Sequence, residues 1–280
     1  MREIDVQRIK EQVKDFFIAM NYEIGDDLNA AMSCAMACEH SELAREVLGD
    51  LLENAKIASE FRIPMCQDTG MAVLFLEIGQ EVRFCGGFIG DAINQGVREA
   101  YEEGYLRKSV VDHPLKRVNT KDNTPAVIHY ELVPGDSLKL ICTAKGFGSE
   151  NMSKIKMLNP SDGVSGVVDF VEETVRLAGS NPCPPMVIGV GIGGTMEKAA
   201  LIAKKALTRD IGQHNKDQAA ADLERLILER INKLNIGPQG FGGHTTAFAV
   251  HIEIFPTHIA GLPVAVNINC HASRHREVIL

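Results

Sequence analysis

The sequence predicts an α+β fold (mixed α/β), with an N-terminal helical bundle followed by a mixed sheet with packed helices. Apolar residues recur at helical spacing through most of residues 1–60. From residue 61 onward, strand-like apolar runs are mixed with further helical segments, without a regular βαβ alternation. Neither an internal repeat nor a disordered linker interrupts the chain. We therefore expect residues 1–280 to form a single domain, helical over 1–60 and mixed α/β over 61–280.

The helical periodicity of the first part predicts three helices. They are expected near residues 5–21, 26–39 and 41–59. Cys34 and Cys38 lie four residues apart in the second helix, so they face the same way. A metal site is one interpretation of this pair. Because free cysteine behaves mostly as a small buried hydrophobe, we expect both residues in the core.

The second part combines strands and helices. A strand over 71–78 precedes a helix near 91–104, and residues 126–133 and 138–143 are expected to pair as a hairpin. Ser161 is the expected N-cap, and Gly179 the expected end, of a helix over 162–178. The remaining elements follow in order: a strand at 186–190, helices near 195–208 and 217–234, and strands at 246–255 and 262–268.

The composition is that of an ordinary globular protein. The chain is 45% hydrophobic and 24% charged, and its net charge is −8 with basic and acidic residues interleaved, which argues against nucleic acid as the main partner. The N-terminus lacks the apolar core of a signal peptide, and no apolar run could span a bilayer. Seven cysteines without a secretory signal indicate reduced thiols. We expect a cytoplasmic protein without a membrane partner.

Three cysteines stand in unusual segments. Cys66 lies in Pro-Met-Cys-Gln-Asp-Thr-Gly, directly before a strand-like run. Cys183 is surrounded by three prolines, which exclude a helix interior, and Cys270 follows another strand-like run. Cysteines on loops at strand ends can meet in space. Their wide spacing is not that of zinc fingers or ferredoxins, and by itself it favours separate cysteines over a shared site.

The motifs resemble, in order, those of the class I iron–sulfur fumarate hydratase family, specifically its alpha subunit. They are Pro64–Gly70, Ala144–Asn151, Cys183-Pro184-Pro185 with Gly193-Gly194-Thr195, and Cys270. L-tartrate dehydratase alpha subunits share them. The resemblance covers essentially the whole chain. It implies a hydro-lyase whose favoured reaction is the reversible hydration of fumarate to malate, with L-tartrate dehydration as the alternative.

The resemblance implies that Cys66, Cys183 and Cys270 bind a 4Fe–4S cluster. Three thiolates hold three irons of a cube and leave the fourth open, so that it can act as a Lewis acid on the substrate. A closed structural zinc site would need four ligands. It stays open as an alternative because further donors are present. These donors are His244, His271 and His275.

Asp68 is the expected catalytic residue. Beside Cys66, it would contact the substrate and orient water at the open iron, while Gln67 would hydrogen-bond a substrate carboxylate. The plainer alternative is that Asp68 only caps a turn through backbone contacts.

Four further residues complete the expected substrate site. In the resembling family the Gly-Ser loop borders the substrate, which assigns Gly146, Gly148 and Ser149. Lys145 could add charge there or be solvated. Arg107 matches, by its place after a helix, an arginine that the family uses on the substrate. Arg98 and Lys108 are close enough in sequence to take that role if the alignment is shifted.

Two other motifs suggest different protein classes. Gly189–Gly194 follows a strand and reads G-x-G-x-x-G, with Asp210 further on, as in dinucleotide-binding proteins. No strand is expected between the next helix and Asp210, as that fold requires. Asp68-Thr69-Gly70 matches the aspartic protease triplet, but a second copy is absent. We keep one alternative to the hydro-lyase from another class of protein: a non-catalytic iron–sulfur or nucleotide-binding protein.

The resemblance also implies a partner. In the single-chain enzymes of the family, a beta part supplies further substrate-binding arginines, a lysine and a catalytic threonine. This sequence ends at Leu280, ten residues after Cys270. We expect a separate beta subunit to complete the active site for a small dicarboxylate.

Overall fold

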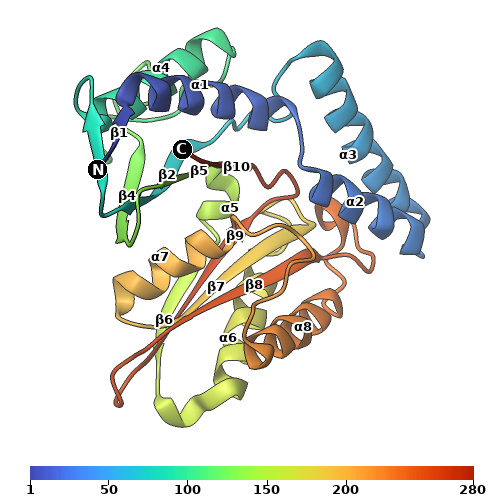
Figure 1. The fold of residues 1–280 in the computed structure, drawn as a ribbon. Coiled ribbons are helices and arrows are strands. Elements are labelled where there is room, and N and C mark those ends of the chain that lie inside the picture. Colours follow the sequence, from blue (N-terminus) through green and yellow to red (C-terminus); the bar gives the residue numbers. More distant parts are fainter. The chain divides into compact units, whose positions relative to one another are not determined.

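The computed structural model describes residues 1–280, which fold into two compact units (Figure 1). Unit 1 comprises residues 1–25, 54–147 and 274–280, and unit 2 comprises residues 26–53 and 148–273. Each unit contains a four-stranded sheet. The mixed α+β class is confirmed. The expectation of a single catalytic domain stays a prediction, because the units are built from alternating stretches of the chain.

Unit 1 is built on a sheet in the order β10-β5-β2-β4. Strand β5 is antiparallel to β10 and β2, whereas β2 and β4 are parallel. Strands β1 and β3 form a separate parallel pair. The elements are β1 (Arg2–Asp5), α1 (Val6–Tyr22), the end of α3 (Glu42–Phe61), β2 (Met71–Gly79), β3 (Val82–Cys85), α4 (Ile89–Glu103), β4 (Val127–Val133), β5 (Leu138–Lys145) and β10 (His275–Ile279).

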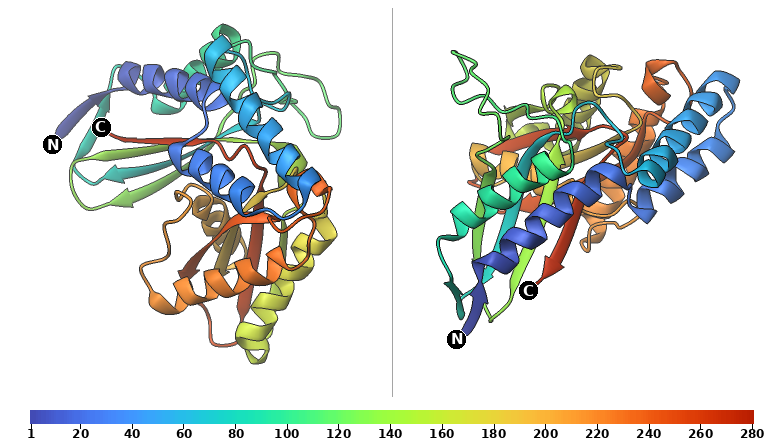
Figure 2. Two further views of the ribbon diagram at one scale, coloured as in Figure 1. Left: turned by 90° about the vertical axis from the view of Figure 1, so that its right-hand side faces the viewer. Right: turned by 90° about the horizontal axis from the view of Figure 1, so that it is seen from above.

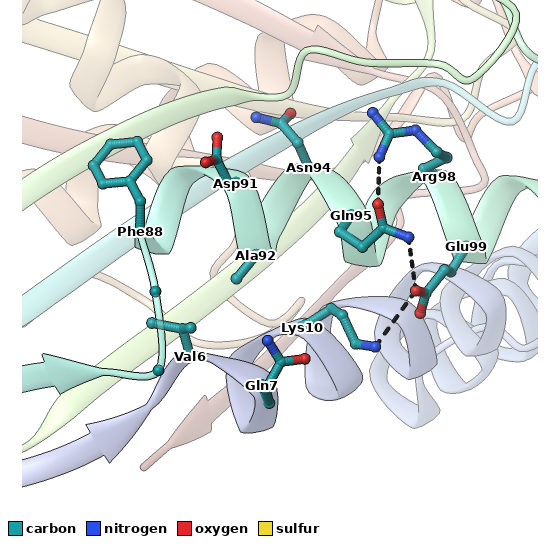
Figure 3. Close-up of a pocket in the computed structure, with 12 residues that line it drawn as sticks. Val6, Gln7, Lys10, Phe88, Asp91, Ala92, Asn94, Gln95, Arg98 and Glu99 are labelled. Atoms are coloured by element: carbon teal, nitrogen blue, oxygen red, sulfur yellow. Dashed lines mark hydrogen bonds and ion pairs between the residues drawn. The ribbon is translucent and has the colours of Figure 1, made fainter.

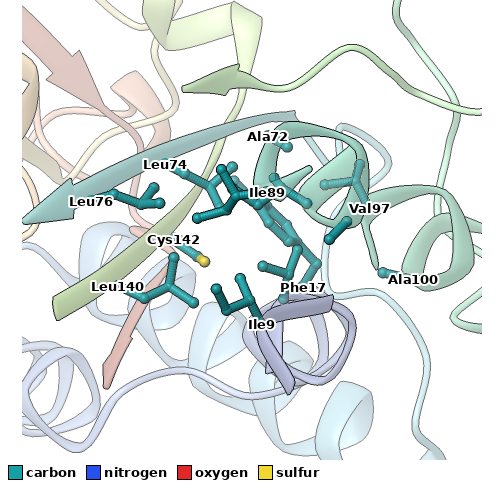
Figure 4. Packing of buried hydrophobic residues seen from close by; sticks show 14 of the residues in the cluster. Ile9, Phe17, Ala72, Leu74, Leu76, Ile89, Val97, Ala100, Leu140 and Cys142 are labelled. Atoms are coloured by element: carbon teal, nitrogen blue, oxygen red, sulfur yellow. The ribbon is translucent and has the colours of Figure 1, made fainter. Parts of the chain in front are cut away.

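Helices α1 and α4 lie side by side along one face of this sheet (Figure 2). The helices expected in the first sixty residues are present, and α1 packs on α4 and β5. The core between them contains Ile9, Phe17, Leu74 and Leu140, each 0% exposed (Figure 4). Cys142 lies in the same cluster, where burial raises the pKa of its thiol. It is therefore a packing residue with a protonated thiol.

The expected hairpin between β4 and β5 is wrong. Both strands exist, but β2 lies between them and pairs with each. The physical reason is burial: the continuous apolar run of β2 suits a central strand, whereas β4 has mostly exposed or half-buried residues and forms an edge. The connection crosses the end of β2 so closely that a Cβ on Gly79 would stand 2.5 Å from the Gly135 carbonyl oxygen.

Unit 2 is built on a sheet in the order β6-β9-β7-β8. Helix α7 covers one face, and α6 and α8 cover the other (Figure 1). The elements are α2 (Asp26–Cys38), the start of α3, α5 (Phe147–Glu150, which begins in unit 1), β6 (Lys154–Leu158), α6 (Gly163–Ala178), β7 (Met186–Gly193), α7 (Met196–Ala206), α8 (Gln218–Asn232), β8 (Ala247–Phe255) and β9 (Leu262–Asn269).

The start of α6 differs from the prediction. Ser161 does not cap it. Instead Asn159 and Asp162 form a capping box around a short 3₁₀ turn, Pro160–Asp162, that leads into the helix. The expected end at Gly179 is confirmed, since its N–H donates to the Val175 carbonyl and its φ is +55°.

The G-x-G-x-x-G run of β7 has a packing role. A Cβ on Gly189 would stand 2.1 Å from the Ala203 carbonyl oxygen, and one on Gly191 would stand 2.1 Å from that of Ala199. These glycines let α7 approach the strand to backbone contact. Strands β7 and β8 are parallel neighbours that are connected through α7 and α8. No strand lies between α7 and Asp210, so Asp210 does not follow a second strand as the acidic residue of a dinucleotide fold does.

Cys34 and Cys38 are both exposed, so their expected place in the core is wrong. Helix α2 buries Leu28, Met32 and Ala35 instead. That face follows the i, i+4, i+7 pattern, and the two cysteines lie outside it.

Glu224, on α8, is only 1% exposed and contacts both β8 and the segment between α7 and α8. It accepts hydrogen bonds from the backbone N–H of Ile252 at 2.8 Å and of Asn215 at 3.1 Å, and pairs with Arg209 at 2.6 Å. Burial opposes its ionisation, but these donors outweigh burial and hold its pKa below the ordinary 4.5. The ionised carboxylate therefore stabilises the contact of α8 with β8 and the loop before α8.

Replacing Glu224 by Gln should lower the free energy of unfolding by about 2 kcal/mol at pH 7, since charged acceptors are lost. Because the folded-state pKa is lowered, this contribution is complete above the unfolded-state pKa and disappears as the pH falls through the folded value. The difference between wild type and variant should therefore shrink progressively as the pH is lowered below 4.5, as measured by urea unfolding at pH 7 and at a series of acidic pH values. Glu229→Gln on the same helix removes only an exposed pair with Lys233 and should change little. Equal losses for the two variants would contradict this assignment.

Candidate active site

The segment after Cys66 is fixed from several sides in unit 1. The Tyr101 hydroxyl donates toward the carbonyl oxygens of Thr69 and Gly70, at 2.9 and 2.7 Å. Burial raises the pKa of Tyr101, which keeps this hydroxyl protonated as a donor. The Thr69 hydroxyl donates to the Arg107 carbonyl at 3.0 Å, and the Asn123 amide donates to Gly70 at 3.2 Å. An irregular loop thereby acquires one defined backbone path.

The Asp68 carboxylate joins this segment to the turn after β5. Its Oδ1 accepts from the Gly70 N–H at 3.0 Å, and its Oδ2 accepts from the Phe147 N–H at 2.7 Å. A Cβ on Gly146 would stand 3.2 Å from Oδ2, so a side chain there would crowd the carboxylate. The turn-capping role given as the plainer alternative is thus present. Asp68 is half-buried and Gln67 exposed, and their substrate contacts stay a prediction.

Arg274 lies near this carboxylate, beside Gly146, and is a residue for which the sequence pattern predicts no role. The residue is only 4% exposed, and its Nη1 donates to the Asn21 side-chain oxygen at 2.7 Å. Its Nη2 lies 3.4 Å from the point where a Cβ on Gly146 would stand, and its buried Nε has no hydrogen-bond partner. The available signal was its position four residues after Cys270. A buried guanidinium thus provides positive charge near Asp68.

Lys145 is also buried, at 1% exposed, so the solvated alternative is wrong. Its Nζ donates to the Gly146 carbonyl at 3.4 Å. Because charged side chains are almost never fully buried without partners, this lysine belongs to the polar interior around the turn after β5.

The environments of Arg107 and Arg98 differ. Through its carbonyl, Arg107 contacts Thr69, and its side chain is exposed beside the Cys66 segment. The guanidinium of Arg98 pairs with Asp122 at 3.0 Å. Lys108 is half-buried. The side chain of Arg107 is therefore available to a ligand, whereas that of Arg98 already has an anionic partner.

A separate open hollow of about 650 Å³ lies along α1 and α4 (Figure 3). Of the residues considered for the site, only the alternative arginine, Arg98, lines it. Two of its charged groups, Lys10 and Glu99, pair with each other at 3.4 Å, and the Gln95 amide also donates to Glu99 at 2.8 Å. This hollow is distinct from the Cys66 segment.

Unit 2 brings the Cys183 and Cys270 segments together. The His271 N–H donates to the Cys183 carbonyl at 3.1 Å. Cys183 has a φ of +55° in its proline-rich turn. Its side chain is exposed and that of Cys270 is half-buried, so both thiols can be reached by a ligand. Cys66, also half-buried, belongs to unit 1.

A glycine-rich loop supports the Cys183 turn. Gln239 donates to the Pro184 carbonyl from its backbone N at 2.7 Å and from its side chain at 2.8 Å. A Cβ on Gly240, whose φ is +82°, would stand 2.3 Å from the Ser180 Cβ. His271 Nδ1 lies 3.1 Å from both the Cys183 carbonyl oxygen and the Gln239 amide nitrogen. This histidine nitrogen is thus engaged in supporting the turn.

Gly148 and Ser149 do not continue the Gly146 turn as a simple loop. They lie in the short helix α5 and belong to unit 2, whereas Gly146 belongs to unit 1. Ser149 is 3% exposed. In unit 2 the helix is anchored by Glu150, which pairs with Lys204 and accepts from the Asn267 amide at 2.9 Å.

The donor set fits an iron–sulfur cluster in chemistry. Two cysteine-bearing turns with accessible thiols lie together in unit 2, and a third accessible cysteine follows the same loop pattern in unit 1. Thiolates are the usual ligands of such clusters. The structure contains no group of three or more His, Cys, Asp or Glu side chains arranged to hold one metal ion. It also contains no helix long and apolar enough to cross a membrane.

Comparisons with known proteins define the class. A model of the fumarate hydratase (Fumerase) family matches residues 10–279. A Methanocaldococcus jannaschii protein named "Putative L(+)-tartrate dehydratase subunit alpha" is 43% identical over 273 residues, covering 95% of each chain. The L(+)-tartrate dehydratase subunit alpha of Escherichia coli O157:H7 is 32% identical over 279 residues, covering 98% of this chain and 91% of its own.

A match of this extent places the protein among the hydro-lyases, enzymes that add or remove water across a carbon–carbon bond. The chain belongs to the fumarate hydratase family.

Proposed function

We propose that this chain is the alpha subunit of a 4Fe–4S hydro-lyase that acts on a four-carbon dicarboxylate. The names of the relatives favour dehydration of L(+)-tartrate, and the family description favours the hydration of fumarate to malate. Fumarate is the reaction that the sequence alone favoured. The relatives make tartrate the first substrate to test, with fumarate second. In both reactions a hydroxyl and a proton are exchanged at neighbouring carbons beside a carboxylate.

One observation carries the proposal: the Asp68 carboxylate is held by two backbone N–H groups, two residues from Cys66. A carboxylate has about four lone-pair sites, so two bonds leave acceptor capacity for a ligand. In this proposal Asp68 accepts a hydrogen bond from the water that is added or the hydroxyl that leaves. That contact fixes the orientation of the reacting oxygen.

Cys66, Cys183 and Cys270 are the proposed cluster ligands. A cluster held by three thiolates supplies Lewis-acid polarisation of the C–O bond through its open iron. The fit rests on the accessible thiols and on the bonded turns of Cys183 and His271.

The other predicted residues hold the substrate. Gln67 and Arg107 are exposed and can donate to a carboxylate, and a guanidinium can do so through two parallel hydrogen bonds. Gly146 leaves room beside Asp68 that a side chain would fill. Gly148 and Ser149 would add backbone and hydroxyl donors. Together these groups bind and orient the dicarboxylate.

A separate beta subunit would complete the site. The relatives are named alpha subunits, which implies a second kind of subunit in their enzymes. A dicarboxylate needs cationic partners at both ends, and the exposed candidate beside Asp68 is Arg107. We assign the opposite cations and the proton-transfer group to the beta subunit, and we place the enzyme in the cytoplasm.

Replacing Cys183 by Ser should remove most cluster iron and abolish activity, because a hydroxyl is a poor substitute for a thiolate ligand. Iron and sulfide are measured after anaerobic reconstitution. Cys34 is an exposed residue of α2, and Cys34→Ser should leave the cluster content and the activity nearly unchanged. A full complement of iron and sulfide in Cys183→Ser would refute the assignment of Cys183 as a cluster ligand.

Replacing Arg107 by Lys should lower kcat/KM by about tenfold or more, since the bidentate contact with a carboxylate is lost. The matched variant is Arg98→Lys, whose residue pairs with Asp122 and should retain most activity. A loss confined to Arg98→Lys would mean that the arginine was assigned wrongly.

The reconstituted alpha chain should be inactive alone and gain activity when a beta subunit is added. The assay uses L(+)-tartrate and fumarate separately, so it also identifies the preferred substrate. Full turnover by the alpha chain alone would refute the two-subunit proposal and require the missing catalytic groups to lie within these 280 residues.

A further inference from the structure

The exposed face of α2 carries two thiols that the proposed active site does not use. Cys34 and Cys38 stand four residues apart on a continuous 13-residue helix. Residues at this spacing are neighbours on one helix face, with Cβ atoms about 5–6 Å apart. Both cysteines are exposed. The sulfur atoms therefore form a pair at the surface of unit 2.

The surroundings of the pair leave both thiols accessible. Helix α2 is anchored by Leu28, Met32 and Ala35, which form a separate, buried face. Next to the cysteines stand Ala30 and Ala37, which are exposed and too short to cover a sulfur atom. Two thiols on a rigid, anchored helix are partly preorganised for a shared ligand, because the backbone loses little freedom on binding.

A disulfide does not suit this spacing. Disulfides need Cβ atoms about 3.5–4.5 Å apart, whereas this helical spacing gives about 5–6 Å. Closing the bond would require α2 to distort. An atom placed between the two sulfurs removes this conflict, because it adds two bonds to the bridge.

The chemistry of the two thiols indicates which metal ion could lie between the sulfur atoms. A hydrogen bond with the neighbouring Cys34 thiol raises the pKa of Cys38, in agreement with the closeness of the two sulfur atoms. Zinc would need four ligands. The carboxylate that follows Cys38 in the sequence, Glu39, is 4% exposed and accepts hydrogen bonds from the backbone N–H groups of His40 and His244 at 3.0 and 2.8 Å. A soft cation that is satisfied by two thiolates fits better.

We propose that Cys34 and Cys38 form a two-thiolate binding site for a soft monovalent cation of the Cu(I) type. On binding, two S–H bonds break and two S–Cu bonds form, and two protons pass to solvent. No oxidant or reductant is required, since copper enters and remains as Cu(I). The site is independent of the proposed hydro-lyase activity.

The test titrates the reduced full-length chain anaerobically with Cu(I), buffered by a chromophoric Cu(I) chelator. The wild type should retain one more copper per chain than Cys34→Ser or Cys38→Ser. Copper bound by the other five cysteines is common to all three proteins and cancels in the comparison. Equal copper content in wild type and both variants would overturn the proposal.

A second measurement locates the metal without a substitution. Trypsin releases residues 15–45 as one fragment, because no Lys or Arg lies between Lys14 and Arg45, and Cys34 and Cys38 are its only cysteines. Bound Cu(I) should protect both from alkylation before digestion, so the fragment mass should lack two alkyl groups. Full alkylation of this fragment in the presence of Cu(I) would refute the site.

Spacing is tested with a matched control. Ser33→Cys combined with Cys34→Ser keeps two cysteines on α2 but places them five residues apart, on different faces. This double variant should lose the additional copper, as the single serine variants do. Retention of that copper would show that any two thiols on this helix suffice, and would overturn the assignment to the i, i+4 pair.

Discussion

The hydrogen bond from the Phe147 N–H to the Asp68 carboxylate joins two segments that are far apart in the sequence of unit 1. It is a side-chain link between the loop before β2 and the turn after β5. The same carboxylate also fixes the next turn through Gly70. Two buried polar side chains support the same loop. Arg274 provides positive charge near Asp68, and the Tyr101 hydroxyl donates to the carbonyl oxygens of Thr69 and Gly70. A group that organises its own loop so firmly is also well placed to orient a ligand.

In unit 2, the local structure depends on glycines that allow two segments to approach each other closely. Gly191 admits α7 against β7, and Gly240 admits its loop against Ser180 in the turn that carries Cys183. In both places any side chain would overlap a neighbour. The glycines thus explain why a sequence run that matches a nucleotide-binding pattern occurs in a protein of another class. A motif of small residues reports tight packing first, and its ligand depends on the surrounding fold.

Most helices and strands could be predicted because hydrophobic periodicity reports which face of each element is buried. Periodicity does not report which strands pair. Residues 126–133 and 138–143 looked like a hairpin because they are neighbours in sequence, yet β2 pairs with both. Average burial predicts the wrong environment for Cys34 and leaves that of Lys145 open, because tertiary packing decides which residue is exposed. The sequence does not predict a role for Arg274, because the burial of its guanidinium and its unpaired Nε are properties of the folded chain. The segments around Cys66 and Asp68 were found because their residue types are unusual together.

The alternation of the chain between the units has a consequence for biosynthesis. Residues 148–273 of unit 2 leave the ribosome before residues 274–280, which belong to unit 1 and include the strand β10. Strand β10 pairs with β5, which was synthesised more than a hundred residues earlier. The sheet of unit 1, and the guanidinium of Arg274 near Asp68, can therefore be completed only after all of unit 2 has emerged. Until then the nascent chain presents an unpaired edge at β5, where premature pairing with another strand is the characteristic risk.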